Sequence, residues 1–210
     1  MEALTIQQIV EAVHGKLLGE FSSTEPIVTR VETDSRTIHP GALFIPLVGE
    51  RFDGHAYIDQ ALEDGAAGCL TQRERESYQP GKFYIRVENT RQALRDLAVW
   101  YRSQFRIQVV AVTGSVGKTT AKDMIASVLS EKFEVLKTDG NKNNDIGLPM
   151  TVLRLEKRHQ IAVVELGINH PGEMDPLSDI ARPDVVVMTN IGDSHIEAFG
   201  SRENTLLAKL

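Results

Sequence analysis

The pattern of apolar and polar positions predicts many short elements in the first part of the chain. Apolar side chains recur at helical spacing over residues 6–13, and Thr5 with Gln8 predicts a capping box at the start of that helix. A second helix is predicted over 57–64. Apolar runs predict strands at 27–31, 42–48, 65–70 and 83–87. Short strands that alternate with helices are typical of a compact α/β unit.

The pattern changes after residue 87, where longer helices separate strands that are apolar throughout. A helix is predicted over 90–105, with a strand at 107–112, a helix at 119–132 and a strand at 135–138. A loop at 140–147, a helix at 149–155 and strands at 161–166 and 185–189 complete the series. Such strands, separated by helices, predict a parallel sheet covered on both faces. We therefore expect a small N-terminal α/β domain over 1–87 and a Rossmann-like parallel-sheet domain over 88–210.

Composition and charge exclude several classes of protein. The 210 residues are 41% hydrophobic and 25% charged, as in ordinary globular proteins. No apolar run reaches the length of a membrane span, and the N-terminus lacks the parts of a signal peptide, so we expect no membrane insertion. A net charge of −6 argues against a broad nucleic-acid surface. The single cysteine, Cys69, excludes internal disulfides and a cysteine metal cluster, and it favours a reducing cytoplasm.

Residues 113–120, Thr-Gly-Ser-Val-Gly-Lys-Thr-Thr, join a predicted strand to a predicted helix and form a phosphate-binding loop. Glycines let the backbone N–H groups turn toward phosphate oxygens, and the helix after the loop adds its dipole. Lys118 is placed for the outer phosphates and the Thr119 hydroxyl for Mg²⁺. The alternative is an ordinary strand-to-helix turn with a chance lysine, which the surrounding elements disfavour. The predicted ATP-binding residues are Gly114, Ser115, Val116, Gly117, Lys118, Thr119 and Thr120.

Polar residues at the ends of the apolar strands are further candidates, because ligands bind at the carboxyl ends of parallel strands. Glu165, at the end of the strand at 161–166, suits a Mg²⁺-ligating carboxylate, although a surface glutamate is the simpler alternative. His195 follows the strand at 185–189 and is a better candidate than the other histidines. The loop at 140–147 offers amide donors for a phosphate or ribose, and from it we include Asn144 among the ATP-binding residues. It could equally be a loop with tolerant backbone angles.

Several motifs together resemble one known family. They are Thr-Asp-Ser-Arg at 33–36, Gly-Glu-Arg-Phe-Asp-Gly-His at 49–55, the phosphate loop, Asn-Lys-Asn-Asn-Asp-Ile-Gly-Leu-Pro at 141–149, Glu-Leu-Gly-Ile-Asn-His-Pro-Gly-Glu at 165–173, Asn-Ile-Gly-Asp-Ser-His at 190–195, Phe-Gly-Ser-Arg at 199–202 and Ala-Lys at 208–209. With them the chain resembles the Mur ligases, the ATP-dependent amide-forming enzymes of peptidoglycan precursor synthesis. The phosphate loop alone would also fit folylpolyglutamate synthases. The stretches at 143–147 and 169–173 favour the type that adds D-alanyl-D-alanine to UDP-N-acetylmuramoyl-tripeptide.

The resemblance implies a three-domain enzyme, of which this chain carries a UDP-binding N-terminal domain and part of the central ATPase domain. We therefore expect a fragment that is inactive alone, and a cytoplasmic, monomeric protein. In this family a substrate carboxylate attacks the γ-phosphate of ATP to give an acyl phosphate. The amine of D-alanyl-D-alanine then displaces phosphate.

The resemblance also implies roles for individual residues. Lys118 contacts the outer phosphates, Thr119 and Glu165 hold a first Mg²⁺, and His195 helps to hold a second. Lys209 aligns with the lysine that the family carbamylates. Because it is penultimate here, we expect it to be frayed and unmodified.

Ser35 and Arg36 sit where the family binds the uridine diphosphate part of the substrate, and an arginine beside a diphosphate has a charge-pairing role. The alternative for these residues is an N-cap turn with a solvated arginine. For the whole chain, two other functions compete with the first. One is a Mur-type ligase that adds a different residue, and the other is a nucleotide-binding module without ligation. The motifs at 33–36 and 49–55, which a bare ATPase would not need, weigh against the second.

Overall fold

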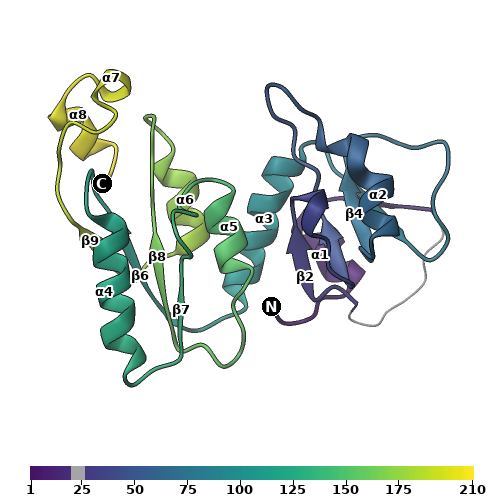
Figure 1. Ribbon diagram of the computed structural model, residues 1–210, viewed down its shortest axis with the longest axis horizontal. Helices are drawn as coiled ribbons and strands as arrows, with labels where there is room; N and C mark the ends of the chain where they lie inside the picture. The colour runs from purple at the N-terminus through teal and green to yellow at the C-terminus, as the bar shows by residue number, and fades with distance from the viewer. Residues whose placement is uncertain (20–26) are drawn as a thin grey trace. The chain divides into compact units, whose positions relative to one another are not determined.

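A computed structural model describes residues 1–19 and 27–210. The chain forms two compact units, Met1–Trp100 and Tyr101–Leu210, and each has its own sheet (Figure 1). None of the helices in the described ranges is long and apolar enough to cross a membrane.

The first unit contains a five-stranded sheet in the order β1-β5-β4-β3-β2. Its strands are β1 (Lys16–Leu18), β2 (Arg30–Glu32), β3 (Ala42–Phe44), β4 (Gly68–Thr71) and β5 (Phe83–Arg86). The pairs among β2, β3, β4 and β5 are parallel, and β1 pairs with β5 in the antiparallel direction. Four of these strands were predicted, with longer bounds, whereas β1 was not.

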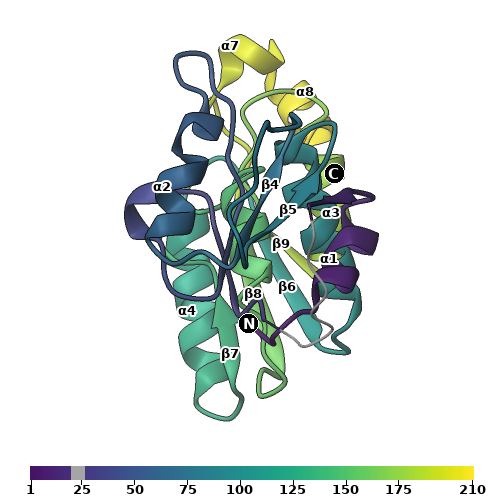
Figure 2. The same cartoon turned by 90° about the vertical axis from the view of Figure 1, so that its right-hand side faces the viewer.

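Helices cover both faces of this first sheet. Figure 2 shows α1 (Ile6–Ala12) and α2 (Ile58–Glu63) on opposite sides of its strands. The predicted capping box of α1 is confirmed, because the Thr5 side chain accepts from the Gln8 N–H and the Gln8 side chain accepts from the Thr5 N–H. The buried side of α2 packs on Phe44, Cys69 and Tyr84 of the sheet. Of two 3₁₀ turns, η1 (Ser35–Thr37) lies shortly after β2 and η2 (Gly54–Tyr57) lies immediately before α2.

The long helix α3 (Thr90–Ser103) runs across the division between the two units. Asn89 begins it, because its side-chain oxygen accepts from the N–H groups of Arg91 and Gln92. The contacts among residues divide the chain between Trp100 and Tyr101, inside this helix. The sequence-based boundary at 87/88, drawn just before α3, stays a prediction about the functional domains.

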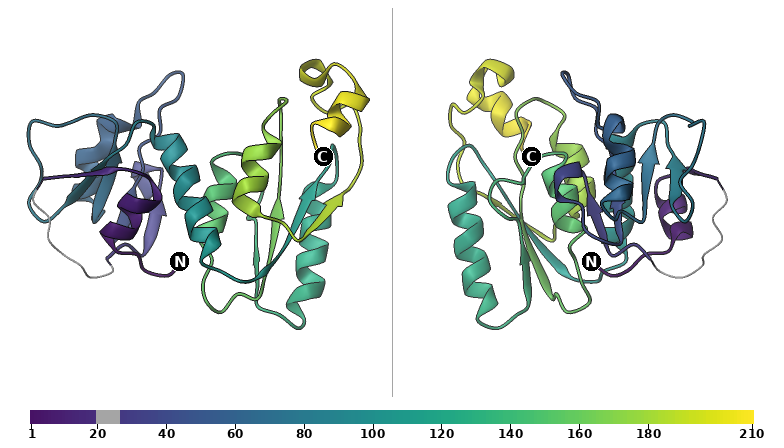
Figure 3. Two further views of the ribbon diagram at one scale, coloured as in Figure 1. Left: turned by 180° about the vertical axis from the view of Figure 1, so that it is seen from behind. Right: turned by 45° about the vertical axis from the view of Figure 1, so that its right-hand side comes forward.

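The second unit contains a four-stranded parallel sheet in the order β7-β8-β6-β9. Its strands are β6 (Gln108–Thr113), β7 (Val135–Lys137), β8 (Ile161–Glu165) and β9 (Val185–Met188). Its helices are α4 (Lys118–Ser130), α5 (Gly147–Val152), α6 (Met174–Ala181), α7 (Ile196–Phe199) and α8 (Arg202–Leu207). Figure 3 (left) shows α5 and α6 on the face of the sheet that lies away from α4. The last three helices were not predicted from the sequence.

Burial differs between the central and the edge strands of this sheet. All five residues of β8 are buried, as expected for a strand covered on both faces. In β9, however, Val185 and Val186 are 53% and 55% exposed. The prediction of a sheet covered on both faces is therefore wrong for β9 in the described residues, because Val185 and Val186 point to opposite faces and both are exposed.

Candidate functional site

The phosphate loop occupies the predicted place between β6 and α4, and its glycines adopt conformations that other residues avoid. Gly114 has φ of +134° and Gly117 has φ of +82°. A Cβ atom on Gly114 would also collide with the Thr189 hydroxyl. The loop therefore requires glycine at both positions of the motif.

The segment after β9 holds this loop in shape. The Ser115 N–H donates to the Asn190 carbonyl at 2.9 Å, and the Val116 N–H donates to the Asn190 side-chain oxygen at 3.0 Å. The Thr189 hydroxyl donates to the Val116 carbonyl at 2.7 Å, and the Ser115 hydroxyl accepts from the Gly192 N–H at 2.9 Å. Because β6 and β9 are parallel neighbours, the residues that come after each strand meet at one edge of the sheet.

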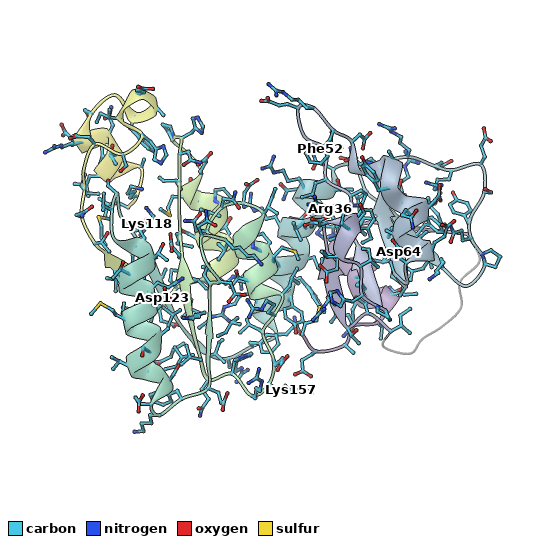
Figure 4. The ribbon with its side chains drawn as sticks, in the orientation of Figure 1. Arg36, Phe52, Asp64, Lys118, Asp123 and Lys157 are labelled. Carbon is cyan, nitrogen blue, oxygen red and sulfur yellow. The ribbon has the colours of Figure 1, made fainter. Side chains whose placement is uncertain are left out.

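Lys118 and the two threonines after it form the first turn of α4, where helix N–H groups lack partners within the helix. Figure 4 shows Lys118 at this end of α4. Its Nζ atom donates to the carbonyls of Gly114 at 2.9 Å and Ser115 at 3.2 Å. The ammonium group is therefore held against the phosphate loop, together with the positive end of the helix dipole.

The Glu165 carboxylate lies beside this first turn. The Thr119 hydroxyl donates to Glu165 Oε2 at 2.9 Å, and Asn143 Nδ2 donates to Glu165 Oε1 at 2.6 Å. The alternative of a surface glutamate is wrong, because Glu165 is 1% exposed. A hydroxyl and a carboxylate are hard oxygen ligands, and Mg²⁺ is commonly held by only one or two carboxylates with several waters. The pair therefore fits a magnesium ion, although no group of three or more histidine, cysteine or acidic residues gathers in the described part of the chain.

Lys209 is placed differently from the expectation. The prediction that it is frayed is wrong, because it is only 5% exposed. Burial lowers the pKa of the Lys209 ammonium, and the nearby positive charge of Lys118 lowers this pKa further. The fold therefore brings the end of the described chain within electrostatic range of the phosphate loop.

His195 and Asn144 lie on loops of this unit. His195 is exposed, has φ of +61° and begins α7. Asn144 is exposed as well, and its side-chain oxygen accepts from the N–H groups of Ile146 and Gly147 at the start of α5. The neighbouring Asn143 lies in the same loop, whose amides were predicted to be donors, but no individual role was predicted for it. It is the residue that reaches Glu165.

Ser35 and Arg36 belong to the first unit, in the turn η1 after β2. Arg36 forms a two-pronged ion pair with Asp34, and these hydrogen bonds lower the pKa of Asp34 to about 2. This geometry agrees with an N-capped turn that carries an exposed arginine. The motif at 49–55 comes after β3, the parallel neighbour of β2, so both motifs lie at the carboxyl edge of the first sheet.

Two residues of the second unit belong to the site although no individual role was predicted for either of them from the sequence. Asn143 contacts Glu165 directly, and the Thr138 hydroxyl accepts from the Glu165 N–H at 3.0 Å. Thr138 immediately follows the strand β7, so the rule that selected Glu165, a polar residue at a strand end, would have selected it too. No comparable signal distinguishes Asn143 from the neighbouring asparagines.

Comparison with protein families gives two matches, which together cover most of the chain. The Mur ligase middle domain matches residues 112–210, and the Mur ligase family catalytic domain matches residues 27–102.

Individual relatives are similar over nearly the whole chain. A UDP-N-acetylmuramoyl-tripeptide--D-alanyl-D-alanine ligase of Bacillus subtilis is 45% identical over 98% of this chain, which covers 45% of that relative. The crystal structure of MurF from Acinetobacter baumannii is 40% identical with a TM-score of 0.92, over 100% of this chain and 46% of that one. MurF from Thermotoga maritima in complex with ADP is 37% identical with a TM-score of 0.78, over 87% of this chain and 42% of that one. The chain thus spans about half the length of the curated relatives that it matches.

Proposed function

Because this chain belongs to the Mur ligase family, we propose that it is the substrate-binding and nucleotide-binding part of a ligase that adds D-alanyl-D-alanine to UDP-N-acetylmuramoyl-tripeptide. The observation that carries this proposal is the Thr119 hydroxyl bonded to the Glu165 carboxylate at the end of a phosphate loop. Similarity to the UDP-N-acetylmuramoyl-tripeptide--D-alanyl-D-alanine ligase of Bacillus subtilis favours this reaction over the addition of a different residue. The chain spans only about half of the length of such a ligase.

In the proposed reaction the substrate carboxylate attacks the γ-phosphorus of ATP, which gives an acyl phosphate and releases ADP. The amine of D-alanyl-D-alanine then attacks the acyl carbon and displaces phosphate. Both steps need charge neutralisation around the phosphoryl group, which positioned cations and N–H donors supply. Binding of ATP is supported by the loop geometry at 113–120 and by the ADP complex of the Thermotoga maritima relative.

We assign the nucleotide contacts to the loop and to the first turn of α4. The N–H groups of 114–120 would surround the phosphates, and the Lys118 ammonium would bind their outer oxygens. Thr119 and Glu165 would hold Mg²⁺, which when bound neutralises phosphate charge. His195 would contribute to a second ion. Asn144 would contact ATP from the loop before α5.

Lys209 is the proposed carbamylation site, in line with the family resemblance. An amine must lose its proton before it reacts with carbon dioxide, and burial favours the neutral amine. The carbamate would replace the positively charged ammonium of Lys209 with an anionic group. Its oxygens are ligands that suit a hard divalent ion.

We assign the uridine diphosphate part of the substrate to the carboxyl edge of the first sheet. Arg36 would exchange its bond to Asp34 for a bidentate contact to phosphate, and the Ser35 hydroxyl would add a further bond. We also propose that the protein acts as a monomer in the cytoplasm, where ATP is available. The competing function, nucleotide binding without ligation, would leave this edge of the sheet without a ligand.

The proposal is tested by calorimetric titration of the chain with UDP-N-acetylmuramoyl-tripeptide, with UDP and MgATP in separate titrations. We expect saturable binding of the muropeptide that Ser35→Ala or Arg36→Ala weakens. Arg158→Ala, which removes another exposed arginine paired with carboxylates, is the matched control and should leave binding unchanged. Binding of MgATP without any UDP compound would refute the ligase assignment in favour of the nucleotide-binding module.

A further inference from the structure

Helix α4 carries a fully buried lysine that the phosphate contacts do not use. Lys122 is 1% exposed, and its Nζ atom donates to the carbonyls of Thr138 at 2.8 Å and Gly140 at 3.3 Å. The Asp123 carboxylate lies 3.3 Å from the same atom. A buried ammonium is costly unless its hydrogen bonds are satisfied, and here three oxygens surround it. The lysine therefore anchors the backbone where β7 ends and the next loop begins.

That backbone leads directly to the proposed magnesium ligand. Thr138 is completely buried, its N–H donates to the Val163 carbonyl at 3.1 Å, and its hydroxyl accepts from the Glu165 N–H at 3.0 Å. The loop that starts at Thr138 also carries Asn143, whose amide donates to the Glu165 carboxylate. The anchored segment thus contacts both the backbone and the side chain of Glu165.

The position of Lys122 on α4 links this anchor to the other ligand. Thr119 and Lys122 are three residues apart, so they project from one face of the helix. One of them bonds the Glu165 carboxylate, and the other bonds the segment that supports Glu165. The two contacts together fix the distance between the first turn of α4 and the end of β8.

We propose that Lys122 and Thr138 are positioning residues that hold the Glu165 carboxylate toward the Thr119 hydroxyl. Lys122 fixes the Thr138 carbonyl, Thr138 fixes the Glu165 N–H, and the loop that they anchor brings Asn143 to the carboxylate. The identity of the bound ion, Mg²⁺ with a nucleotide, rests on the proposed function. The positioning itself concerns hydrogen bonds within this chain and is tested separately.

The test compares local and global opening of the chain by amide hydrogen exchange in NMR spectra, with urea unfolding as the global reference. Lys122→Met keeps the length of the side chain but removes the donor, and Thr138→Val removes only the hydroxyl. Thr138→Ser keeps a hydroxyl and is the conservative variant. Leu129→Ala, on the same helix in the apolar cluster under α4, is the control for general destabilisation.

In Lys122→Met and Thr138→Val we expect the rate of hydrogen exchange at the Glu165 N–H to rise. The rise should be at least about tenfold larger than the loss of global stability predicts, because this N–H then exchanges through local opening. Thr138→Ser should retain the protection, and Leu129→Ala should change it only in proportion to global stability. If protection of the Glu165 N–H in Lys122→Met also falls only in proportion to global stability, the role of Lys122 is overturned. If Lys122→Met does not fold, Lys122→Gln replaces it. Its shorter side chain keeps a donor, so we expect a smaller excess of exchange at the Glu165 N–H, and a loss of protection only in proportion to global stability would overturn the role of Lys122.

A second measurement separates this inference from the proposed function. Mg²⁺ is titrated into each variant in the presence of ADP, and we expect the apparent Mg²⁺ affinity to fall about 10- to 100-fold in Lys122→Met and Thr138→Val, as for other groups that orient a metal ligand. Absence of MgADP binding in the parent chain, with the exchange result intact, would refute the nucleotide site and leave the positioning role standing. Unchanged Mg²⁺ affinity in variants of a chain that binds MgADP would refute the role of the pair in ion binding.

Discussion

The Thr119 hydroxyl donates a hydrogen bond of 2.9 Å to the Glu165 carboxylate, and this bond joins the first turn of α4 to the end of β8. The two residues are 46 positions apart in the sequence. They meet because β6 and β8 are parallel neighbours in which Val112 pairs with Glu165. The phosphate loop that leaves β6 and the carboxylate that ends β8 therefore share one edge of the sheet.

Removal of the Thr119 hydroxyl should weaken both the fold and ion binding. We expect Thr119→Val to lower the free energy of unfolding by about 1 to 2 kcal/mol, because a buried carboxylate loses a hydrogen bond. The variant should also lose most of the stabilisation that Mg²⁺ with ADP gives to the parent chain. Thermal unfolding with and without MgADP measures both effects. Thr119→Ser keeps the hydroxyl and should resemble the parent, whereas an equal loss in Thr119→Ser would show that the methyl group matters instead.

Gly167 leaves the space that Asn143 occupies. A Cβ atom at Gly167 would lie 2.7 Å from Asn143 Cγ, and the Gly167 N–H also donates to the Asn143 carbonyl. We expect Gly167→Ala to push the Asn143 amide away from Glu165 and to destabilise the chain by about 1 to 3 kcal/mol. Urea unfolding measures the stability change.

Gly192→Ala is the matched control for this substitution. Its Cβ would meet Ser115 only at 3.6 Å, an ordinary contact, so we expect a smaller loss of stability than for Gly167→Ala. Equal losses of stability in the two variants would argue that Asn143 moves away from the added Cβ atom without a loss of free energy.

Lys209 should make stability depend on pH in the alkaline range. Its pKa is lowered in the folded chain from an ordinary value of 10.5, because burial disfavours the charged form. Between the two values the unfolded chain binds more protons than the folded chain, so stability rises with pH there. We expect Lys209→Met to be at least as stable as the parent at neutral pH and to lose this rise. The difference in free energy of unfolding between Lys209→Met and the parent should therefore become smaller as the pH approaches the ordinary pKa of lysine.

Urea unfolding over a pH series in buffer free of carbon dioxide measures this effect on the unmodified amine. Lys157→Met, at an exposed position, is the control and should keep the slope of the parent. A parallel slope in Lys209→Met would contradict the assignment of the titration to Lys209. Gentle mass spectrometry of the parent in ordinary buffer tests the proposed carbamylation. A mass increase that matches a carbamate on Lys209 would support it, and an unmodified Lys209 would contradict it.

Cys69 should be unreactive while the chain is folded. Burial raises the pKa of its thiol from 9.0 to about 12, and the thiolate is the reactive form. We expect a disulfide reagent at mildly alkaline pH to react with Cys69 only in urea. For the same reason the contribution of Cys69 to stability, measured as the difference between the parent and Cys69→Ala, should fall as the pH rises above 9.0, since the unfolded thiol then loses its proton first. Fast stoichiometric reaction in native buffer would contradict this burial.

The sequence alone was sufficient where the structure depends on neighbouring residues. The phosphate loop was predicted in place because glycines with positive φ, a lysine and a helix start are coded within a short stretch of the chain. The capping box of α1 and the positions of β6, β8 and α3 depend on equally local patterns. Glu165 was also found, because the end of an apolar strand marks the binding edge of a parallel sheet.

Only the tertiary structure decided the partners of these residues, because hydrogen bonds and burial depend on segments that are distant in the sequence. Asn143 contacts Glu165 although the two residues are 22 positions apart in the sequence. The path of the loop before α5 decides that this asparagine, and not a neighbouring one, reaches the carboxylate. Lys209 is buried beside the charge of Lys118, although its place near the chain end indicated fraying. Lys122 is a charged helix residue that is nevertheless buried, and its Nζ atom reaches the carbonyls of Thr138 and Gly140. The sequence thus determined which chemical groups are present, and the packing of strands and helices determined which of them meet.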